Sequence, residues 1–285
     1  MFFLDIWGFT VTFTKEGNDI IIENIQNFSL DLTLDCGQAF RWKKVNDVWE
    51  GVIFGKIQRI SANGQILRFL DTDENFFNKY LIEYFDLNND YKDLRKEFSN
   101  DINLTSAIDE FPGIRILNQD PFECLISFII SQNNNIPRIK KIIESFSVNF
   151  GSKIDESHFA FPTLEQLQDK SAEDLKITGA GFRNKYIVDA VEKTSTGQVD
   201  LYNLCNLSYG QAREELLKIK GVGPKVSDCV LLYSMKFKEA FPRDVWVNKV
   251  LDELYDGNLP QVDKNYLGIA QQFLFHWRRN SKNFC

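Results

Sequence analysis

The spacing of apolar residues changes once along this chain, near residue 74, and that change limits the folds the chain can adopt. Before it, short runs rich in β-branched and aromatic residues are separated by turn pairs such as Gly17-Asn18 and Asn63-Gly64. Beyond it, apolar residues recur with the helical period. The sequence therefore predicts an α+β fold, with a β-rich N-terminal part and a helical remainder.

The individual elements follow from these patterns. Predicted strands cover 10–14, 19–23, 40–45, 48–54, 56–61 and 65–70. Predicted helices cover 74–84, 91–98, 121–131, 137–150, 182–193, 209–218, 224–235, 244–255 and 264–277. Phe111-Pro112-Gly113 interrupts the pattern, so we expect one domain over residues 1–112 and a helical domain over 113–285.

Composition excludes several classes of protein. No apolar run reaches the roughly 18 residues of a membrane span, and the N-terminus lacks a basic region and carries Asp5 in its apolar stretch, unlike a secretory signal. We expect a cytoplasmic protein without membrane contact. The net charge of −7 argues against nucleic acid as a partner unless a local feature binds phosphate.

The cysteines and histidines give little support to a metal or a disulfide scaffold. The five cysteines are scattered and form no CxxC pair, and the chain has only two histidines. The cysteines are Cys36, Cys124, Cys205, Cys229 and Cys285. We therefore expect no metal and no cofactor, and chemistry that rests on Lys, Asp, Ser or Cys.

The most informative segment is 215–251, which contains a helix, a Gly221-Val222-Gly223 turn and a second helix that begins at Pro224. Glycines allow close backbone approach to a ligand, and the N–H groups at a helix start can hold a phosphate. This hairpin answers the charge objection in part, because backbone dipoles need no excess of basic side chains. Taken alone, the pattern is more often an ordinary turn between helices.

Lys225 stands in the first turn of that second helix, where the helix dipole disfavours an ammonium, a setting that suits an amine nucleophile. Cys229 lies four residues later on the same face. Asp244 is placed to cap the next helix and would approach Lys225 if the two helix N-termini converge. A solvated lysine and an ordinary N-cap are the alternative interpretation of the same residues.

With its surroundings, this segment resembles the helix-hairpin-helix signature of base-excision DNA glycosylases, in which the lysine marks the branch with lyase activity. The rest of the chain is similar to the 8-oxoguanine DNA glycosylase family. The matching segments are 36–42 (CGQAFRW), 119–123 (QDPFE), 131–138 (SQNNNIPR), 181–183 (GFR), 225–229 (KVSDC) and 266–271 (YLGIAQ). The resemblance implies a TBP-like antiparallel sheet domain followed by an all-helical domain, and a monomer that acts on damaged double-stranded DNA.

The resemblance also implies a mechanism. A base inside a duplex is unreachable, so the nucleotide must be flipped into a pocket. Lys225 would attack C1′, release the base and form a Schiff base, while Asp244 would stabilise positive charge on the sugar. Strand cleavage would follow by β-elimination.

The base pocket implied by the resemblance uses four residues. The backbone carbonyl of Gly37 would accept the N7–H that 8-oxoguanine has and guanine lacks, and an unpaired buried acceptor would penalise guanine by about 1–3 kcal/mol. Gln271 and Phe275, four residues apart, would read the base edge and stack on one face, and Cys229 would line the other. Core packing is the alternative role for Phe275.

Other residues match family positions that contact DNA. Asn133 would fill the gap left by the flipped base, and Arg138 and Arg183 would hydrogen-bond the cytosine opposite it. Phe182 would act as a wedge, where animal and yeast members carry tyrosine. Trp246 stands where those members carry histidine, which places the chain in a bacterial or archaeal-like branch.

Gly221 and Gly223 would contact the DNA backbone through the hairpin.

Two competing functions remain open at this point. One is a glycosylase for a different damaged base, against which the pocket residues argue. The other is a helix-hairpin-helix DNA-binding module without catalysis, which would need neither Lys225 nor Asp244.

Overall fold

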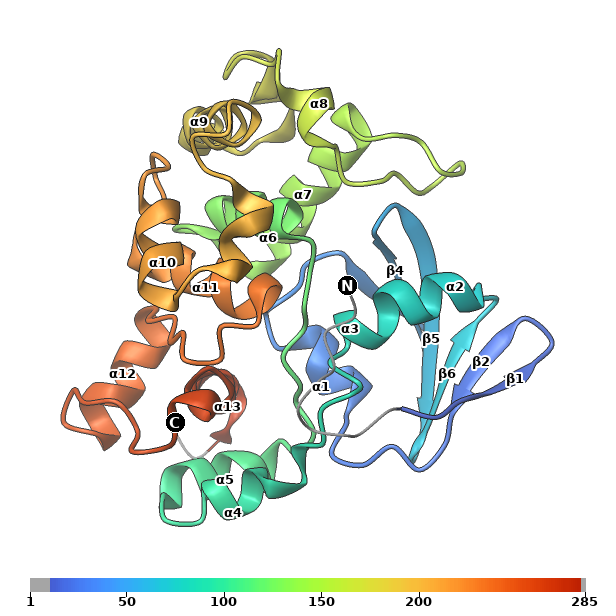
Figure 1. Cartoon of the computed structure of the whole chain (residues 1–285), viewed down its shortest axis with the longest axis vertical. Coiled ribbons are helices and arrows are strands. Elements are labelled where there is room, and N and C mark those ends of the chain that lie inside the picture. Colours follow the sequence, from blue (N-terminus) through green and yellow to red (C-terminus); the bar gives the residue numbers. More distant parts are fainter. Residues whose placement is uncertain (1–10, 283–285) are drawn as a thin grey trace.

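The structure, a computed structural model, describes residues 11–282, and the first third of the chain forms one antiparallel sheet (Figure 1). Its strand order is β1-β2-β6-β5-β4-β3. The strands are β1 (Thr14–Glu16), β2 (Asp19–Ile22), β3 (Trp42–Val45), β4 (Val48–Ile53), β5 (Lys56–Asn63) and β6 (Ile66–Leu70). A row of paired, buried side chains crosses the sheet through Ile20, Phe69, Ile60 and Trp49, which fixes the register.

The predicted strands are confirmed, except at the N-terminus. The strand predicted over 10–14 begins only at Thr14, and residue 10 lies outside the described residues. The segment just before β1 forms no ladder, although Val11 is buried. Its apolar residues pack into the cluster between the sheet and the helical segment over it, where the rings of Phe13 and Phe77 lie 4.9 Å apart between centroids.

One helical segment covers the sheet, and it lies where a helix was predicted, over 74–84. It consists of α2 (Glu74–Phe76), a π-helical turn over Phe77–Leu81 and α3 (Ile82–Tyr84). Its apolar face lies on the buried face of the sheet, where the rings of Phe77 and Phe69 meet edge to face with centroids 5.1 Å apart.

The remaining α-helices lie mostly in the second part of the molecule, and the first of them packs in the cluster on the sheet through Leu30 and Leu34. They are α1 (Leu30–Asp35), α4 (Leu94–Glu97), α5 (Ile102–Glu110), α6 (Pro121–Ser131), α7 (Ile136–Phe150), α8 (Leu164–Leu167), α9 (Asn184–Ser195), α10 (Tyr209–Leu217), α11 (Pro224–Met235), α12 (Val245–Leu254) and α13 (Leu267–Asn280). Asp120 caps α6 by accepting from the N–H groups of Phe122 and Glu123, as the Asp-Pro pair predicted. The sequence patterns did not predict α1, α5 or α8.

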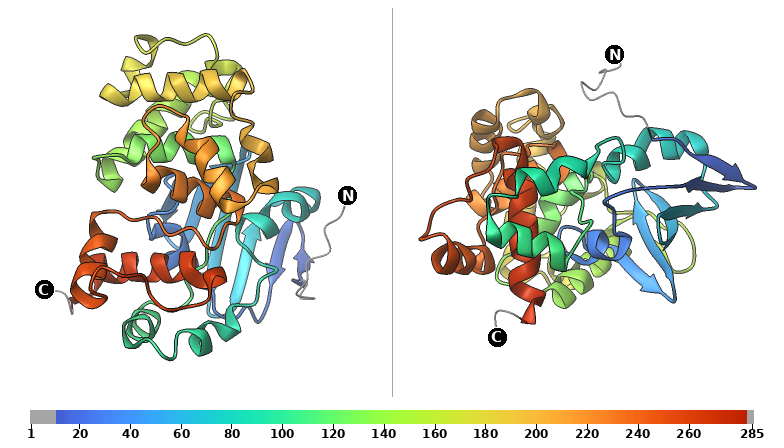
Figure 2. Two further views of the ribbon diagram at one scale, coloured as in Figure 1. Left: turned by 60° about the vertical axis from the view of Figure 1, so that its left-hand side comes forward. Right: turned by 90° about the horizontal axis from the view of Figure 1, so that it is seen from below.

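Two large hydrophobic clusters form most of the core, and a small third cluster of Phe241, Val247 and Leu251 lies at α12. One large cluster lies between the sheet and α2–α3, and the other fills the helical part around α6 and α11, which pack against each other (Figures 1 and 2). Helix α5, although it precedes residue 112, packs on α13 in the helical cluster, and Leu117 packs in the sheet cluster. The boundary at residue 112 therefore stays a prediction. Within residues 11–282, no helix has the length and apolar character to cross a membrane.

Candidate active site

The hairpin between α10 and α11 has the predicted helix, turn and helix. Gly221 has φ +83°, and a Cβ there would lie 2.3 Å from the ring of Tyr186, so the position requires glycine. Gly223 precedes α11 as its N-cap, and Pro224 occupies the first helical position. The side chain of Val222, between the glycines, is buried and anchors the turn.

Lys225 lies in the first turn of α11 and is partly buried. Its Nζ donates to Ser131 Oγ at 3.3 Å and lies 4.9 Å from the centroid of the Phe128 ring. Both partners belong to α6, and Ser131 Oγ in turn donates to the Phe128 carbonyl at 2.8 Å. The end of α6 therefore holds the amine beside an aromatic face.

Asp244 caps α12, as predicted. Its Oδ1 accepts from the N–H groups of Trp246 at 3.0 Å and Val247 at 2.8 Å. These two bonds fix the position of the carboxylate at the N-terminus of α12.

Lys225 and Asp244 line one cavity. The four residues expected to hold the base line the same cavity, namely Gly37, Cys229, Gln271 and Phe275. Three further residues complete its wall, namely Phe128, Tyr233 and Pro242. Sequence reasoning missed these three, although Tyr233 follows Cys229 by four residues and Lys225 by eight, a spacing that predicts one helical face.

Gly37 lies in close contact with Phe275. Its φ is +86°, and a Cβ at this position would meet the Phe275 ring at 3.2 Å and Ile136 at 3.3 Å. The cavity measures about 40 Å³, whereas a cavity that accepts benzene measures about 150 Å³. A purine is larger than benzene, so the cavity must widen before a base can enter.

The Cys229 thiol is protonated at neutral pH. Burial raises its pKa to about 11, although the neighbouring Lys225 acts in the opposite direction. Cys229 therefore presents a neutral, weakly polar wall to the cavity, and its protonated thiol is a poor nucleophile.

The residues predicted to contact the opposite base gather at a different place. The guanidinium of Arg183 is buried and donates to the carbonyls of Gln132, Asn133 and Ala180. It also lies 4.5 Å from the centroid of the Phe182 ring. Burial and the nearby Arg138 lower the pKa of Arg183.

Three of these side chains reach solvent. Asn133, with φ +47°, and Arg138 are exposed, and Phe182 is 51% exposed. Trp246 stands apart from them at the start of α12, beside Asp244, with Lys249 Nζ 5.2 Å from its ring centroid. An exposed aromatic residue and two basic residues beside one loop are suited to a nucleic-acid surface.

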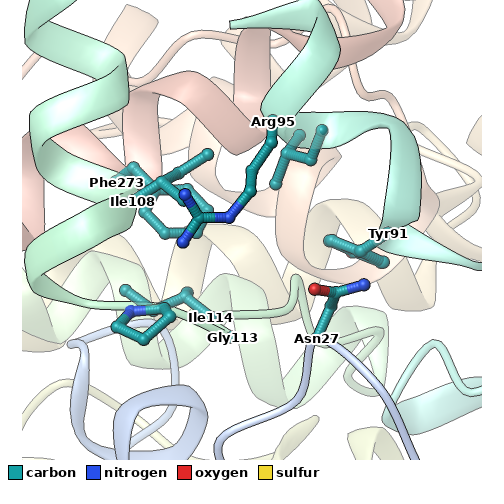
Figure 3. A pocket seen from close by; sticks show the side chains of 9 residues that line it. Asn27, Tyr91, Arg95, Ile108, Gly113, Ile114 and Phe273 are labelled. Carbon is teal, nitrogen blue, oxygen red and sulfur yellow. The ribbon is translucent and has the colours of Figure 1, made fainter. Parts of the chain in front are cut away.

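A second cavity lies away from these residues (Figure 3). It measures about 50 Å³ and is lined in part by Asn27, Tyr91, Ile108 and Phe273. Arg95 also lines it but is paired with Asp109, and none of the predicted site residues takes part. Among residues 11–282, no group of His, Cys, Asp or Glu side chains is arranged to hold a metal ion.

Comparison with known proteins agrees with this geometry. Residues 20–125 match the family profile described as 8-oxoguanine DNA glycosylase, N-terminal domain. The probable N-glycosylase/DNA lyase of Methanothermobacter thermautotrophicus is 31% identical over 82% of this chain and 84% of its own. The N-glycosylase/DNA lyase of Saccharomyces cerevisiae is 31% identical over 86% of this chain and 72% of its own.

A solved structure extends the likeness to the whole fold. The Clostridium acetobutylicum 8-oxoguanine glycosylase/lyase, in complex with double-stranded DNA containing cytosine opposite 8-oxoG, is 38% identical. It superposes with a TM-score of 0.89 over 95% of this chain and 98% of that chain. The fold and the lysine-bearing hairpin define a helix-hairpin-helix DNA glycosylase. Within that class, the chain belongs to the 8-oxoguanine DNA glycosylase family, whose members are N-glycosylase/DNA lyase enzymes.

Proposed function

We propose that this enzyme excises 8-oxoguanine opposite cytosine from double-stranded DNA and then cleaves the strand. The observation that carries the proposal is the cavity itself, where Lys225 and Asp244 lie beside Gly37, Cys229, Gln271 and Phe275. An amine, a carboxylate, a backbone turn and a stacking ring in one recess are the groups that such a reaction needs. The likeness to the Clostridium enzyme bound to such a duplex supports the same substrate.

In the proposed reaction, the amine of Lys225 attacks C1′ of the flipped nucleoside. The bond between C1′ and N9 breaks, and its electron pair leaves with the base. Asp244 stabilises the positive charge that develops on the sugar. Loss of the amine proton and opening of the sugar ring give a Schiff base. Removal of a C2′ proton then expels the 3′ phosphate by β-elimination.

Base selection in this proposal depends on Gly37. Its carbonyl accepts the N7–H of 8-oxoguanine, and guanine offers a second acceptor at that place instead of a donor. Gln271 reads the Watson–Crick edge, while Phe275 and Cys229 lie against the two faces of the base. Phe275 must first move away from Gly37, because the resting cavity is too small.

The opposite strand meets the second group of residues. Arg138 is exposed and free to reach the acceptors of cytosine, with Phe182 as a wedge and Asn133 in the gap. Arg183 supports the same loop through its carbonyls, and it contacts cytosine only if one of those bonds is exchanged. Gly221, Gly223 and Trp246 contact the DNA backbone.

Borohydride trapping tests the reaction. The protein is incubated with duplexes that carry 8-oxoguanine, another damaged base or guanine opposite cytosine, and borohydride reduces any Schiff base to a stable adduct. We expect an adduct with the 8-oxoguanine duplex, and none with Lys225→Gln although that variant still binds it. An adduct with the other damaged base alone would reassign the substrate. Binding to the duplexes without any adduct would indicate a DNA-binding module without catalysis.

A further inference from the structure

Gly37 lies between two carbonyls that buried amides hold in place. The Cys36 carbonyl accepts from Gln272 Nε2 at 3.0 Å, and the Gln38 carbonyl accepts from Gln119 Nε2 at 2.8 Å. Within residues 11–282, no group donates a hydrogen bond to the carbonyl of Gly37 itself. The backbone is therefore fixed on both sides of a carbonyl that is left available.

Gln38 strengthens this arrangement from within the loop. Its side chain is fully buried and donates to the carbonyls of Thr33 at 2.9 Å and Arg115 at 2.8 Å. Its Oε1 accepts from the N–H of Leu117 at 2.9 Å. These bonds tie the loop to α1 and to the 115–117 segment. They therefore hold the loop independently of α11, the helix that carries Lys225.

Tyr233 is part of α11 and connects the loop to this helix by two routes. Its hydroxyl donates to Gln272 Oε1 at 2.6 Å, and the same Gln272 side chain holds the Cys36 carbonyl. Its backbone carbonyl accepts from the N–H of Gln119 at 2.8 Å, and Gln119 holds the Gln38 carbonyl. Tyr233 lies two helical turns beyond Lys225 on α11, so both routes begin on the helix that carries the amine.

The Tyr233 hydroxyl also contacts Gln271, the residue proposed to read the Watson–Crick edge of the base. Tyr233 Oη lies 3.3 Å from Gln271 Oε1, and the Tyr233 ring is stacked on Phe128 with centroids 5.5 Å apart. Gln272 is 1% exposed and Tyr233 4% exposed, so water does not compete for these bonds. The Gln272 side-chain amide is hydrogen-bonded through both Oε1 and Nε2, so it has a single orientation. A change in one of these bonds therefore disturbs the other.

We propose that Gln272 and Tyr233 are positioning residues that set the preference for 8-oxoguanine over guanine, by fixing the Gly37 carbonyl relative to α11. The inference rests on the proposed function, in which that carbonyl reads N7–H. In this role neither residue reads N7 itself. Gln272 holds the peptide that precedes Gly37, and Tyr233 holds the orientation of Gln272.

Equilibrium binding tests the inference in the Lys225→Gln background, where no excision occurs. Two duplexes are compared that differ only in 8-oxoguanine or guanine at one position opposite cytosine. Gln272→Met keeps the length and volume of the side chain but removes both hydrogen bonds. We expect it to reduce the ratio of the two affinities about three- to tenfold, as the loss of one or two buried hydrogen bonds implies.

Tyr233→Phe provides a milder change and guards against a folding defect. It removes only the hydroxyl, and we expect the ratio to fall about twofold to fivefold. Gln58→Met is the matched control, because Gln58 is a buried amide on β5 that donates to the Ile57 carbonyl at 2.8 Å, accepts from Thr72 Oγ1 at 3.4 Å and does not line the cavity. It should lower the melting temperature and leave the ratio unchanged.

The outcomes separate this inference from the proposed function. If the protein with Gln272 and Tyr233 intact binds both duplexes equally, the proposed substrate is wrong. If that protein prefers 8-oxoguanine, but folded Gln272→Met and Tyr233→Phe retain the full ratio, the positioning role is overturned and the substrate stands. A fall in the ratio with Gln58→Met as large as with Gln272→Met would also overturn it, because general destabilisation would then explain the effect.

Discussion

Asp244 accepts two backbone hydrogen bonds at the start of α12 and, in the proposed reaction, also faces the sugar. Asparagine caps a helix about as well as aspartate, but it carries no charge. We expect Asp244→Asn to slow single-turnover excision while the melting temperature stays within a degree or two. Asp244→Ala removes both roles, and it should also lose about 1 kcal/mol of stability. Unchanged excision in a folded Asp244→Asn protein would show that the carboxylate is only a cap.

Arg138 is the residue that we expect to decide the opposite-base preference. Loss of a charged hydrogen bond costs about 1.5–3 kcal/mol, or roughly a ten- to hundredfold change in rate. Arg138→Met should therefore slow excision opposite cytosine and narrow its advantage over adenine, while 8-oxoguanine is still preferred over guanine. The measurement is single-turnover excision from four duplexes that differ only in the opposing base.

Arg183→Met serves as the comparison for that experiment. Arg183 holds the loop of Gln132 and Asn133 through buried hydrogen bonds, so its loss should also lower the melting temperature. Arg138 is exposed and should not affect stability. If the preference for cytosine survives Arg138→Met but not Arg183→Met, the role assigned to Arg138 belongs to Arg183.

Much of the candidate site was predicted from the resemblance to a known family, and helical spacing explains which of its residues share a face. Lys225 with Cys229, and Gln271 with Phe275, are each four residues apart, and each pair lines the cavity. Gln272 could not be found in this way. Its importance lies in a bond to Cys36, 236 residues away in sequence, and no local pattern encodes such a contact.

At the scale of elements, the hairpin before α11 offers a test with an internal control. A Cβ at Gly221 would overlap the Tyr186 ring at φ +83°, whereas one at Gly223 would meet nothing within 4 Å. We expect Gly221→Ala to lose about 1–3 kcal/mol of stability and to weaken binding to undamaged duplex, and Gly223→Ala to do little. Thermal unfolding and a binding titration measure both, and equal effects of the two substitutions would contradict the role of the turn.

The elements that sequence patterns missed are those held by tertiary contacts. Helix α5 has the sequence INLTSAIDE, whose β-branched and polar residues favour helix weakly, and it forms because Asp101 caps it and Leu104 and Ile108 pack in the helical core. Helix α1 is only six residues long and begins at the cap Ser29. The long helices and the strands bounded by Asn-Gly turns were predicted because their signals are local.

At the scale of the whole molecule, the 151–160 segment attaches to the sheet through His158. Its Nε2 contacts Glu50 of β4 at 2.9 Å, and its Nδ1 contacts Asp155 at 2.8 Å. Partial burial opposes the imidazolium, but hydrogen bonds to the two carboxylates outweigh it and raise the pKa of His158 above 6.5. This attachment stabilises the fold fully below pH 6.5 and is lost as the pH rises through the higher folded pKa.

We therefore expect His158→Gln to flatten the loss of stability between neutral and alkaline pH. His276 provides the reference for the acid side of the stability profile, because burial lowers its pKa to about 4. Its contribution is full above pH 6.5 and is lost as the pH falls towards 4. Free energies of unfolding measured from pH 4 to pH 9 should show the acid limb unchanged in His158→Gln, and an unchanged alkaline limb would exclude the proposed attachment.

The closeness of Phe275 to Gly37 has a consequence for how the protein searches a genome. No base can enter a cavity of about 40 Å³ until the ring has moved. A stacked, undamaged base pair provides no contact that would favour this movement, so most encounters end at the surface of the duplex. In the proposed function, we therefore expect the rate of diffusion along DNA to be limited by contacts with the phosphates rather than by repeated filling and emptying of the pocket.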